Sequence, residues 1–140
     1  MRASDSKLLA LLRANAREPT ASLARKLGLA RSTVQERIAR LEREGMIKGY
    51  TVKLAEDAGG RLKAAVMIST DPKQGERVAT ELKKMTEVRS LVTVSGVFDL
   101  IASVEAESPA RLDAALDRIG RLHGVARTVS SIILSEKFSR

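Results

Sequence analysis

Hydrophobic residues recur at helical spacing along the first third of the chain and predict three short helices. Their apolar stripes are Leu8, Leu9 and Leu12, then Leu23, Ala24 and Leu27, then Val34, Ile38 and Leu41. Ser4 or Asp5 is placed to start the first helix, and Pro19 breaks the chain before the second. A three-residue turn containing glycine joins the second and third helices, which is typical of a helix-turn-helix.

The residues at the ends of these helices support the same prediction. Thr20 can cap the second helix through its side-chain oxygen, and Gly28 can end that helix in the left-handed conformation. Gly45 closes the third helix, and residues 46–52 then predict an extended, partly buried strand. Residues 1–54 are therefore expected to form a winged helix-turn-helix domain.

The pattern changes after a polar segment with a glycine pair, residues 55–62, which we interpret as a linker. Strands are predicted at 63–70, 88–95, 100–105 and 125–134, and helices at 75–85 and from 109 onwards. Ser108 and Pro109 suit the start of the last helix, and Gly124 is expected to end it. The order β-α-β-β-α-β predicts an α+β fold in which residues 63–140 form a ferredoxin-like sandwich.

Several of these strands are apolar on both faces, as in residues 65–68, 100–102 and 132–134. Two helices can cover only one face of the sheet. A face that meets water normally shows alternating polar residues. We therefore expect the second face to pack against another copy of the chain, giving a dimer.

The two halves of the chain differ in net charge. The chain carries +8, with 12 basic and 5 acidic residues over 1–55 but 13 and 12 over 56–140. The excess of positive charge coincides with the helix-turn-helix, which predicts a polyanionic partner, double-stranded DNA.

Composition excludes several other classes. The chain has no cysteine and one histidine, so neither a disulfide framework nor a thiolate or multi-histidine metal site is expected. His123 suits the end of a helix, where the dipole favours it. No catalytic triad, carboxylate pair or phosphate-binding glycine loop is present in the sequence, so we expect neither an enzyme nor a cofactor. No signal peptide or membrane-spanning run is visible, which predicts a cytoplasmic protein.

The chain resembles the Lrp/AsnC, or feast/famine, family of transcription regulators over nearly its whole length. The resemblance rests on Asp5, on residues 23–29, on Val34, Arg37, Ile38, Leu41 and Glu42, on residues 45–50, and on Gly96 with Asp99. It implies a homodimer joined through the C-terminal sheets, often assembled into octamers. It also implies an amino-acid or related metabolite effector in the C-terminal domain. Ala30 and Arg31 depart from the Ser-Pro pair common in the family before the third helix.

The third helix carries the candidates for DNA recognition. On a helical wheel the core side is Val34, Ile38 and Leu41, with the polar residues opposite or on the flanks. We expect base readout from Ser32, Thr33, Gln35 and Glu36, because recognition helices present their N-terminal residues to base edges. Phosphate contacts are expected from Arg31, Arg37, Arg40 and Lys48. The alternatives are an intrahelical pair of Glu36 with Arg40 and a packing role for Arg37.

By the resemblance, the hairpin formed by Gly96, Val97, Phe98 and Asp99 borders the effector pocket. Asp99 is suited to an effector ammonium group and the backbone near Gly96 to its carboxylate. The alternative is an ordinary β-turn capped by Asp99. Thr128 and Ser130 on the last strand are further candidates for contacts to the effector, or plain strand residues.

Two other functions fit the same architecture. Some proteins similar to this family decarboxylate sirohaem-type tetrapyrroles, although the basic charge here lies in the helix-turn-helix half rather than around a C-terminal pocket. RNA-recognition modules share the βαββαβ order but stack bases on strand aromatics. The chain has three aromatic residues in all, so regulation of transcription is the preferred interpretation.

Overall fold

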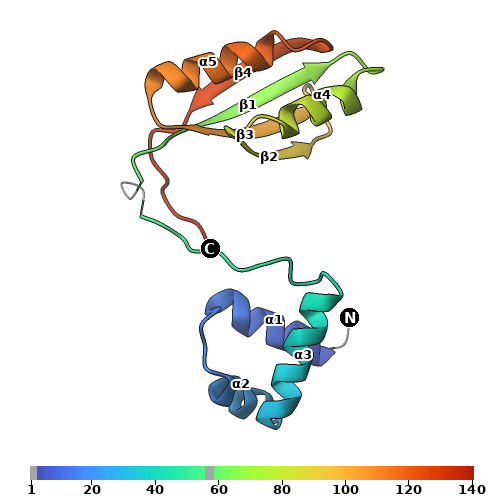
Figure 1. Ribbon diagram of the computed structural model, residues 1–140, viewed down its shortest axis with the longest axis vertical. Helices are drawn as coiled ribbons and strands as arrows, with labels where there is room; N and C mark the ends of the chain where they lie inside the picture. The colour runs from blue at the N-terminus through green and yellow to red at the C-terminus, as the bar shows by residue number, and fades with distance from the viewer. Residues whose placement is uncertain (1–2, 56–58) are drawn as a thin grey trace. The chain divides into compact units, whose positions relative to one another are not determined.

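A computed structural model describes residues 3–55 and 59–140 of the chain (Figure 1). It divides into two compact units, Met1–Lys53 and Leu54–Arg140. Part of the predicted linker, residues 56–58, lies outside the described residues. Each unit has its own hydrophobic core, as expected for two separate domains.

The N-terminal unit contains the three predicted helices: α1 (Ala3–Ala14), α2 (Thr20–Leu27) and α3 (Arg31–Arg43). Each predicted apolar stripe supplies buried residues to one core, made of Leu8, Leu12, Leu23, Ala24, Val34 and Leu41. Gly28 ends α2 at φ +66°, with its N–H directed to the carbonyl groups of Ala24 and Arg25. The short turn to α3 forms because glycine adopts this left-handed conformation at little cost.

Two details of this unit differ from prediction. Thr20 is the first residue of α2 rather than its cap, because Pro19, with φ −58° and ψ 142°, takes the capping position. Residues 46–52 form no strand in the described structure. Tyr50 and Val52 are exposed there. A strand requires a partner for its backbone groups, and no segment of residues 3–55 or 59–140 supplies one here.

The C-terminal unit has the predicted βαββαβ order. Its elements are β1 (Leu62–Thr70), α4 (Gly75–Lys83), β2 (Val88–Thr93), β3 (Leu100–Ala106), α5 (Pro109–Gly120) and β4 (Val125–Ile132). All pairings in the sheet are antiparallel, in the order β2-β3-β1-β4. The two helices pack on one face of this sheet (Figure 1), which confirms the ferredoxin-like prediction.

The ends of α5 show one prediction confirmed and one wrong. The Ser108 hydroxyl caps the helix by accepting a hydrogen bond from the Arg111 N–H at 3.1 Å. The helix ends at Gly120, before the predicted stop at Gly124. Gly124 instead turns the chain into β4 at φ +97°, where an added Cβ would lie 2.5 Å from the Gln74 side chain. The close approach of α4 therefore requires glycine at this position.

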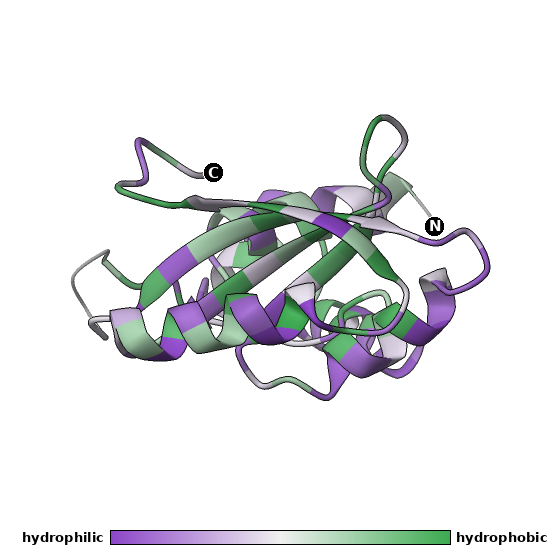
Figure 2. Cartoon of the chain, turned by 90° about the horizontal axis from the view of Figure 1, so that it is seen from above, coloured by the Kyte–Doolittle hydropathy of each residue, from purple (hydrophilic) through white to green (hydrophobic). Residues whose placement is uncertain are grey.

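The sheet face opposite the helices carries an apolar row across all four strands. Register pairs Val92 with Ile101, Ile101 with Met67, and Met67 with Val129. Paired residues point to the same side of a sheet, and their neighbours Ile68 and Ala102 are buried on the helical side. Figure 2 shows hydrophobic colouring along these strands. Val92 is 52% exposed and Val129 41% exposed, so this face is uncovered in a single chain.

Candidate nucleic-acid interface and ligand site

The first turns of α3 present the residues expected to read bases. Ser32, Gln35 and Glu36 are exposed, and Thr33 is half-buried. Val34 on the same turns is completely buried, so it anchors the helix while its neighbours face outward. This arrangement leaves polar side chains at the N-terminal end of α3 free to enter a groove.

Arg40 occupies a different position from the one predicted. Its Nη2 lies 2.9 Å from the Asp5 Oδ1 of α1, and its Nη1 lies 3.8 Å from Glu44. Asp5 is 1% exposed. Arg40 therefore faces α1 as a counterion of a buried carboxylate, an arrangement that favours a structural role over the predicted phosphate contact. A helical wheel does not indicate this contact because it carries no information about α1, which lies beside this flank of α3.

Glu36 pairs with a different arginine from Arg40, which the sequence offered as its alternative partner. Its carboxylate lies 3.4 Å from the Arg43 Nη2, and both side chains are exposed. Ion pairs between exposed side chains contribute little to stability. Glu36 can exchange Arg43 for a base edge at small cost.

A cluster around Glu18 engages one of the basic residues of α2. The Lys26 ammonium and the Ser22 hydroxyl both hydrogen-bond to Glu18 and hold the pKa of its carboxyl below the ordinary value. Because this pKa is lowered on folding, the stability from the cluster is present above the ordinary pKa and is lost as the pH falls through the lowered value.

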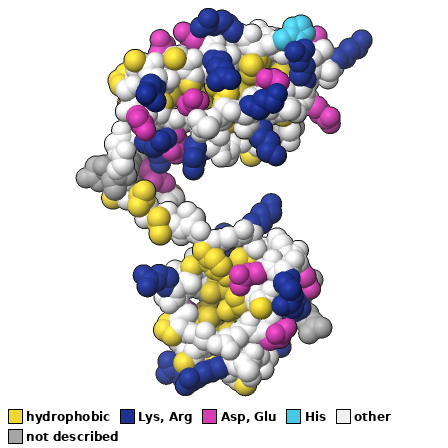
Figure 3. Space-filling model, viewed as in Figure 1, with side chains coloured by type: hydrophobic (Ala, Val, Ile, Leu, Met, Phe, Trp, Pro, Cys, Tyr) yellow, Lys and Arg dark blue, Asp and Glu magenta, His cyan; other side chains and the backbone are white. Residues whose placement is uncertain are grey.

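Several other cations of this unit have no ion pair within residues 3–55 and 59–140. They are Arg25, Arg31, Arg37 and Lys48. Arg37 is half-buried, and its Nη1 is a buried donor without a hydrogen-bond partner in the same part of the chain. Figure 3 shows Lys and Arg side chains at several points around the N-terminal unit. These unpaired cations are the ones available to phosphate groups.

Arg25 is a candidate that the sequence interpretation missed. It is exposed and lines a hollow at the helix-turn-helix turn together with Arg31. Helical periodicity placed Arg25 beside the core residue Ala24 without indicating that it would face the turn. The start of α3 adds to the positive potential there, because Ala30 provides no side-chain cap for the N–H groups of the first turn.

The hairpin between β2 and β3 contains the predicted ligand residues. Gly96 adopts φ +139° and Val97 is 80% exposed. Phe98 is half-buried, and the guanidinium carbon of Arg127 lies 4.9 Å from its ring centroid. The tip of the hairpin therefore exposes backbone and apolar side chain rather than charge.

Asp99 forms a structural contact in this hairpin. Its Oδ2 accepts a hydrogen bond from the Thr70 N–H at 2.8 Å, and its own N–H donates to the Ile68 carbonyl at 2.9 Å. These bonds tie the hairpin to the end of β1 and give Asp99 a structural contact there, outside the turn itself. The side chain is exposed, so the carboxylate also meets solvent.

Thr128 and Ser130 are on β4, and β1 separates β4 from β3 in the sheet, although the neighbouring Arg127 reaches the Phe98 ring. They pair with Ile68 and Val66, which are buried on the helical side. Their side chains therefore point toward the helix-covered face.

Among the residues that the structure describes, no helix is long and apolar enough to cross a membrane. No group of three or more histidine, cysteine, aspartate or glutamate side chains is arranged there to hold a metal ion.

Comparison with known proteins covers both units. A model of the Lrp/AsnC ligand binding domain matches residues 63–140, and a model of winged helix-turn-helix DNA-binding domains matches residues 1–48. Among relatives, the transcriptional regulator LrpA of Mycobacterium tuberculosis is 34% identical, over 96% of this chain and 91% of its own. The transcriptional regulator LysM of Sulfurisphaera tokodaii is 30% identical, over 94% and 93%.

Solved structures show the same two-domain fold. The crystal structure of the leucine response regulatory protein LrpA of Mycobacterium tuberculosis is 34% identical with a TM-score of 0.85, covering 99% of this chain and 96% of that one. A transcriptional regulator of Neisseria meningitidis in complex with L-methionine is 25% identical with a TM-score of 0.82, covering 99% and 93%.

Proposed function

The chain belongs to the Lrp/AsnC family of helix-turn-helix transcriptional regulators, and we propose that it is a dimeric, sequence-specific regulator whose DNA binding responds to an amino acid or related small metabolite. The observation that carries the DNA-binding part is the exposed N-terminal end of α3, where Arg25 and Arg31 line a hollow at the preceding turn and have no ion pair in the described residues. A positively charged helix end of this kind suits the major groove.

Within this proposal the side chains divide into two roles. Ser32, Thr33, Gln35 and Glu36 read base edges, with glutamine suited to adenine and glutamate to the amino group of cytosine. Phosphate groups are contacted by Arg31, Arg37 and Lys48, joined by Arg25 in place of Arg40. Phosphate contacts set affinity and register, whereas base contacts set sequence preference.

The dimer is proposed from the uncovered apolar row of Val92, Ile101, Met67 and Val129. A contiguous apolar face of a sheet is stabilised when a second sheet removes it from water. Two copies related by a two-fold axis would bring the same row together from each side. Two helix-turn-helix units in one dimer would then suit a pseudo-palindromic operator.

We expect Val129→Lys to convert the protein into a monomer. Residue 129 lies in the apolar row, and a lysine there would place an ammonium group in a desolvated interface opposite apolar side chains. Sedimentation of the full chain at micromolar concentration measures the change and also shows whether dimers assemble into octamers. Thr80→Lys on the exposed surface of α4 is the matched control and should sediment as the unchanged protein does. An unchanged protein that is itself monomeric would contradict the dimer.

The proposed effector site lies at the hairpin of Gly96, Val97, Phe98 and Asp99, with Thr128 and Ser130 as further candidates. Asp99 supports the proposal because its carboxylate is exposed while the hydrogen bond to Thr70 fixes its position. An ammonium group can pair with such a carboxylate without breaking that bond. The complex of a related regulator with L-methionine supports the choice of amino acids as probes.

The experiment that tests this function is calorimetry with a panel of common amino acids, in the presence and absence of operator DNA. We expect Asp99→Asn to weaken effector binding by about tenfold or more, because the amide keeps an acceptor for Thr70 but loses the charge that pairs with ammonium. Operator DNA should change effector affinity by the same factor by which effector changes DNA affinity. If Asp99→Asn binds the amino acid as tightly as the original chain, the hairpin is only a turn. If no amino acid binds at millimolar concentration, the proposal of an amino-acid effector is wrong.

A further inference from the structure

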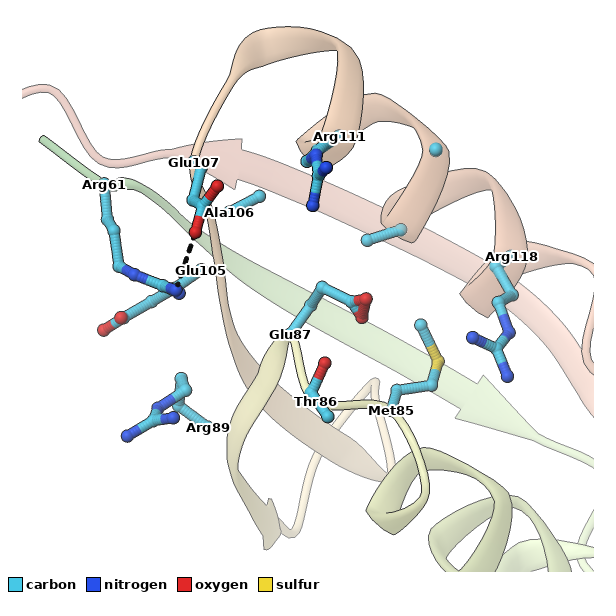
Figure 4. Close-up of a pocket in the computed structure, with 12 residues that line it drawn as sticks. Arg61, Met85, Thr86, Glu87, Arg89, Glu105, Ala106, Glu107, Arg111 and Arg118 are labelled. Carbon is cyan, nitrogen blue, oxygen red and sulfur yellow. Dashed lines mark ion pairs between the residues drawn. The ribbon is translucent and has the colours of Figure 1, made fainter.

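A cavity of about 460 Å³ lies in the C-terminal unit, where α5 passes over the start of β2 and the end of β3 (Figure 4). Its lining includes Met85 and Ala115, which belong to the core between the helices and the sheet. The cavity therefore opens on the helical side, opposite the apolar row, and a sheet-to-sheet dimer leaves it open. Its volume falls in the range of about 300–1,000 Å³ that small-molecule sites occupy.

Glu87 is placed at the centre of this cavity with an unsatisfied acceptor. Its Oε2 is buried and has no hydrogen-bond partner in the described parts of the chain. The Glu87 carbonyl accepts the Glu105 N–H at 2.8 Å, so the backbone of the residue is fixed to β3. Figure 4 shows the carboxylate directed into the cavity. A buried acceptor of this kind is expected to find a donor, and a bound molecule with an N–H group would supply one.

Two arginines of α5 reach toward the same space. Arg111 and Arg118 line the cavity, both extend from the helix toward it (Figure 4), and neither has an ion pair within residues 3–55 and 59–140. They are seven positions apart, so they lie on one side of the helix about 10 Å from each other. The small Ala114 lies between them and leaves room.

The other charged side chains at the cavity already have partners or lie at its edge. Arg61 lies 3.6 Å from Glu107, and Glu105 lies 3.9 Å from Lys63. Arg89 lines the rim and is exposed, as Arg111 and Arg118 are, but its guanidinium points away from Glu87 (Figure 4). The groups left to bind a ligand are therefore guanidinium groups on one side and one carboxylate on the other.

Guanidinium groups of this kind bind phosphate through paired N–H donors. A glutamate accepts from the exocyclic amino group of a base such as cytosine. The apolar floor, formed by Met85, Ala106 and Ala115, suits a flat ring, and the methionine thioether makes favourable contacts with aromatic groups. We propose that this cavity binds a cytosine mononucleotide, with the phosphate on Arg111 and Arg118 and the amino group of the base on Glu87.

Calorimetry on the full chain with cytidine monophosphate, uridine monophosphate and cytidine tests the proposal. Cytidine monophosphate should bind about tenfold more tightly than uridine monophosphate, because uracil presents an acceptor to Glu87 where cytosine presents a donor. Cytidine should bind at least about tenfold more weakly than its monophosphate, because it lacks the group that pairs with the arginines. Equal affinity for all three, or binding by none at millimolar concentration, would overturn the proposal.

Two substitutions separate recognition from folding. Glu87→Gln should abolish the preference for cytidine monophosphate, because the amide can accept from the cytosine amino group and can also donate to the uracil carbonyl. Arg111→Gln should weaken both nucleotides, whereas Arg77→Gln on the exposed part of α4, outside the cavity, should weaken neither. Loss of binding in Arg77→Gln, or an unchanged preference in a folded Glu87→Gln, rejects the assigned contacts.

If Glu87→Gln does not fold, the nucleotide comparison and Arg111→Gln still decide the outcome. If amino acids displace the nucleotide from this cavity, the nucleotide proposal is also contradicted.

Discussion

Raising the salt concentration from about 50 mM to about 200 mM is expected to weaken DNA binding by a thousandfold or more, on the order of the loss seen for proteins that contact six to ten phosphates. Four of the cations without an ion pair in the described residues, Arg25, Arg31, Arg37 and Lys48, are expected to supply three to four phosphate contacts in each protomer. A dimer should then show a slope of about −5 to −7 in log K against log salt. A filter-binding titration on a genomic fragment selected by the protein measures the slope, and an affinity insensitive to salt would contradict the electrostatic basis of binding.

Matched variants of α3 distinguish the two kinds of contact in this titration. Arg31 is exposed and has no ion pair in the described residues, so Arg31→Ala should weaken all DNA sequences alike and flatten the slope by about one for each protomer. Gln35 is also exposed, and Gln35→Ala should keep the slope but relax preference at one operator position, at a cost of about 1–3 kcal/mol there. Equal losses on specific and random DNA for both variants would reject these roles.

Arg40→Met is expected to destabilise the helix-turn-helix unit by about 2–3 kcal/mol. It removes the counterion 2.9 Å from Asp5, a carboxylate that is 1% exposed. The cost is below the ~3–5 kcal/mol of a fully buried pair because the Arg40 side chain is 27% exposed. Hydrogen exchange of the amides in α1 to α3 measures the effect, which corresponds to about 30- to 150-fold faster exchange.

Two controls make this test specific. Arg43→Met lies one turn further along α3 and breaks only an exposed pair with Glu36, so its effect should stay within about 0.5 kcal/mol. The double variant Asp5→Leu with Arg40→Met replaces both charges by apolar side chains and should recover most of the loss. If Arg40→Met instead leaves exchange unchanged and reduces affinity for all DNA alike, Arg40 contacts phosphate as first expected from the sequence.

The sequence by itself determined the elements whose causes are local. Apolar stripes at helical spacing placed α1, α2 and α3, because a helix must bury one face and its own residues define that face. Gly28 and Ser108 marked a helix end and a helix start, since each acts on backbone groups within a few residues. The order of strands and helices was sufficient for the ferredoxin-like topology, and the doubly apolar strands anticipated the uncovered row on the sheet.

Only the tertiary structure decided features that join distant parts of the chain. Asp5 and Arg40 are 35 residues apart, and a helical wheel contains no information about the helix that lies beside it. Asp99 reaches Thr70 across 29 residues, and the strand order places β1 between β3 and β4, the strand of Thr128. The strand expected over residues 46–52 needed a partner that the described chain does not supply. Glu87, Arg111 and Arg118 have no sequence pattern in common, and they share a cavity because α5 folds over the sheet.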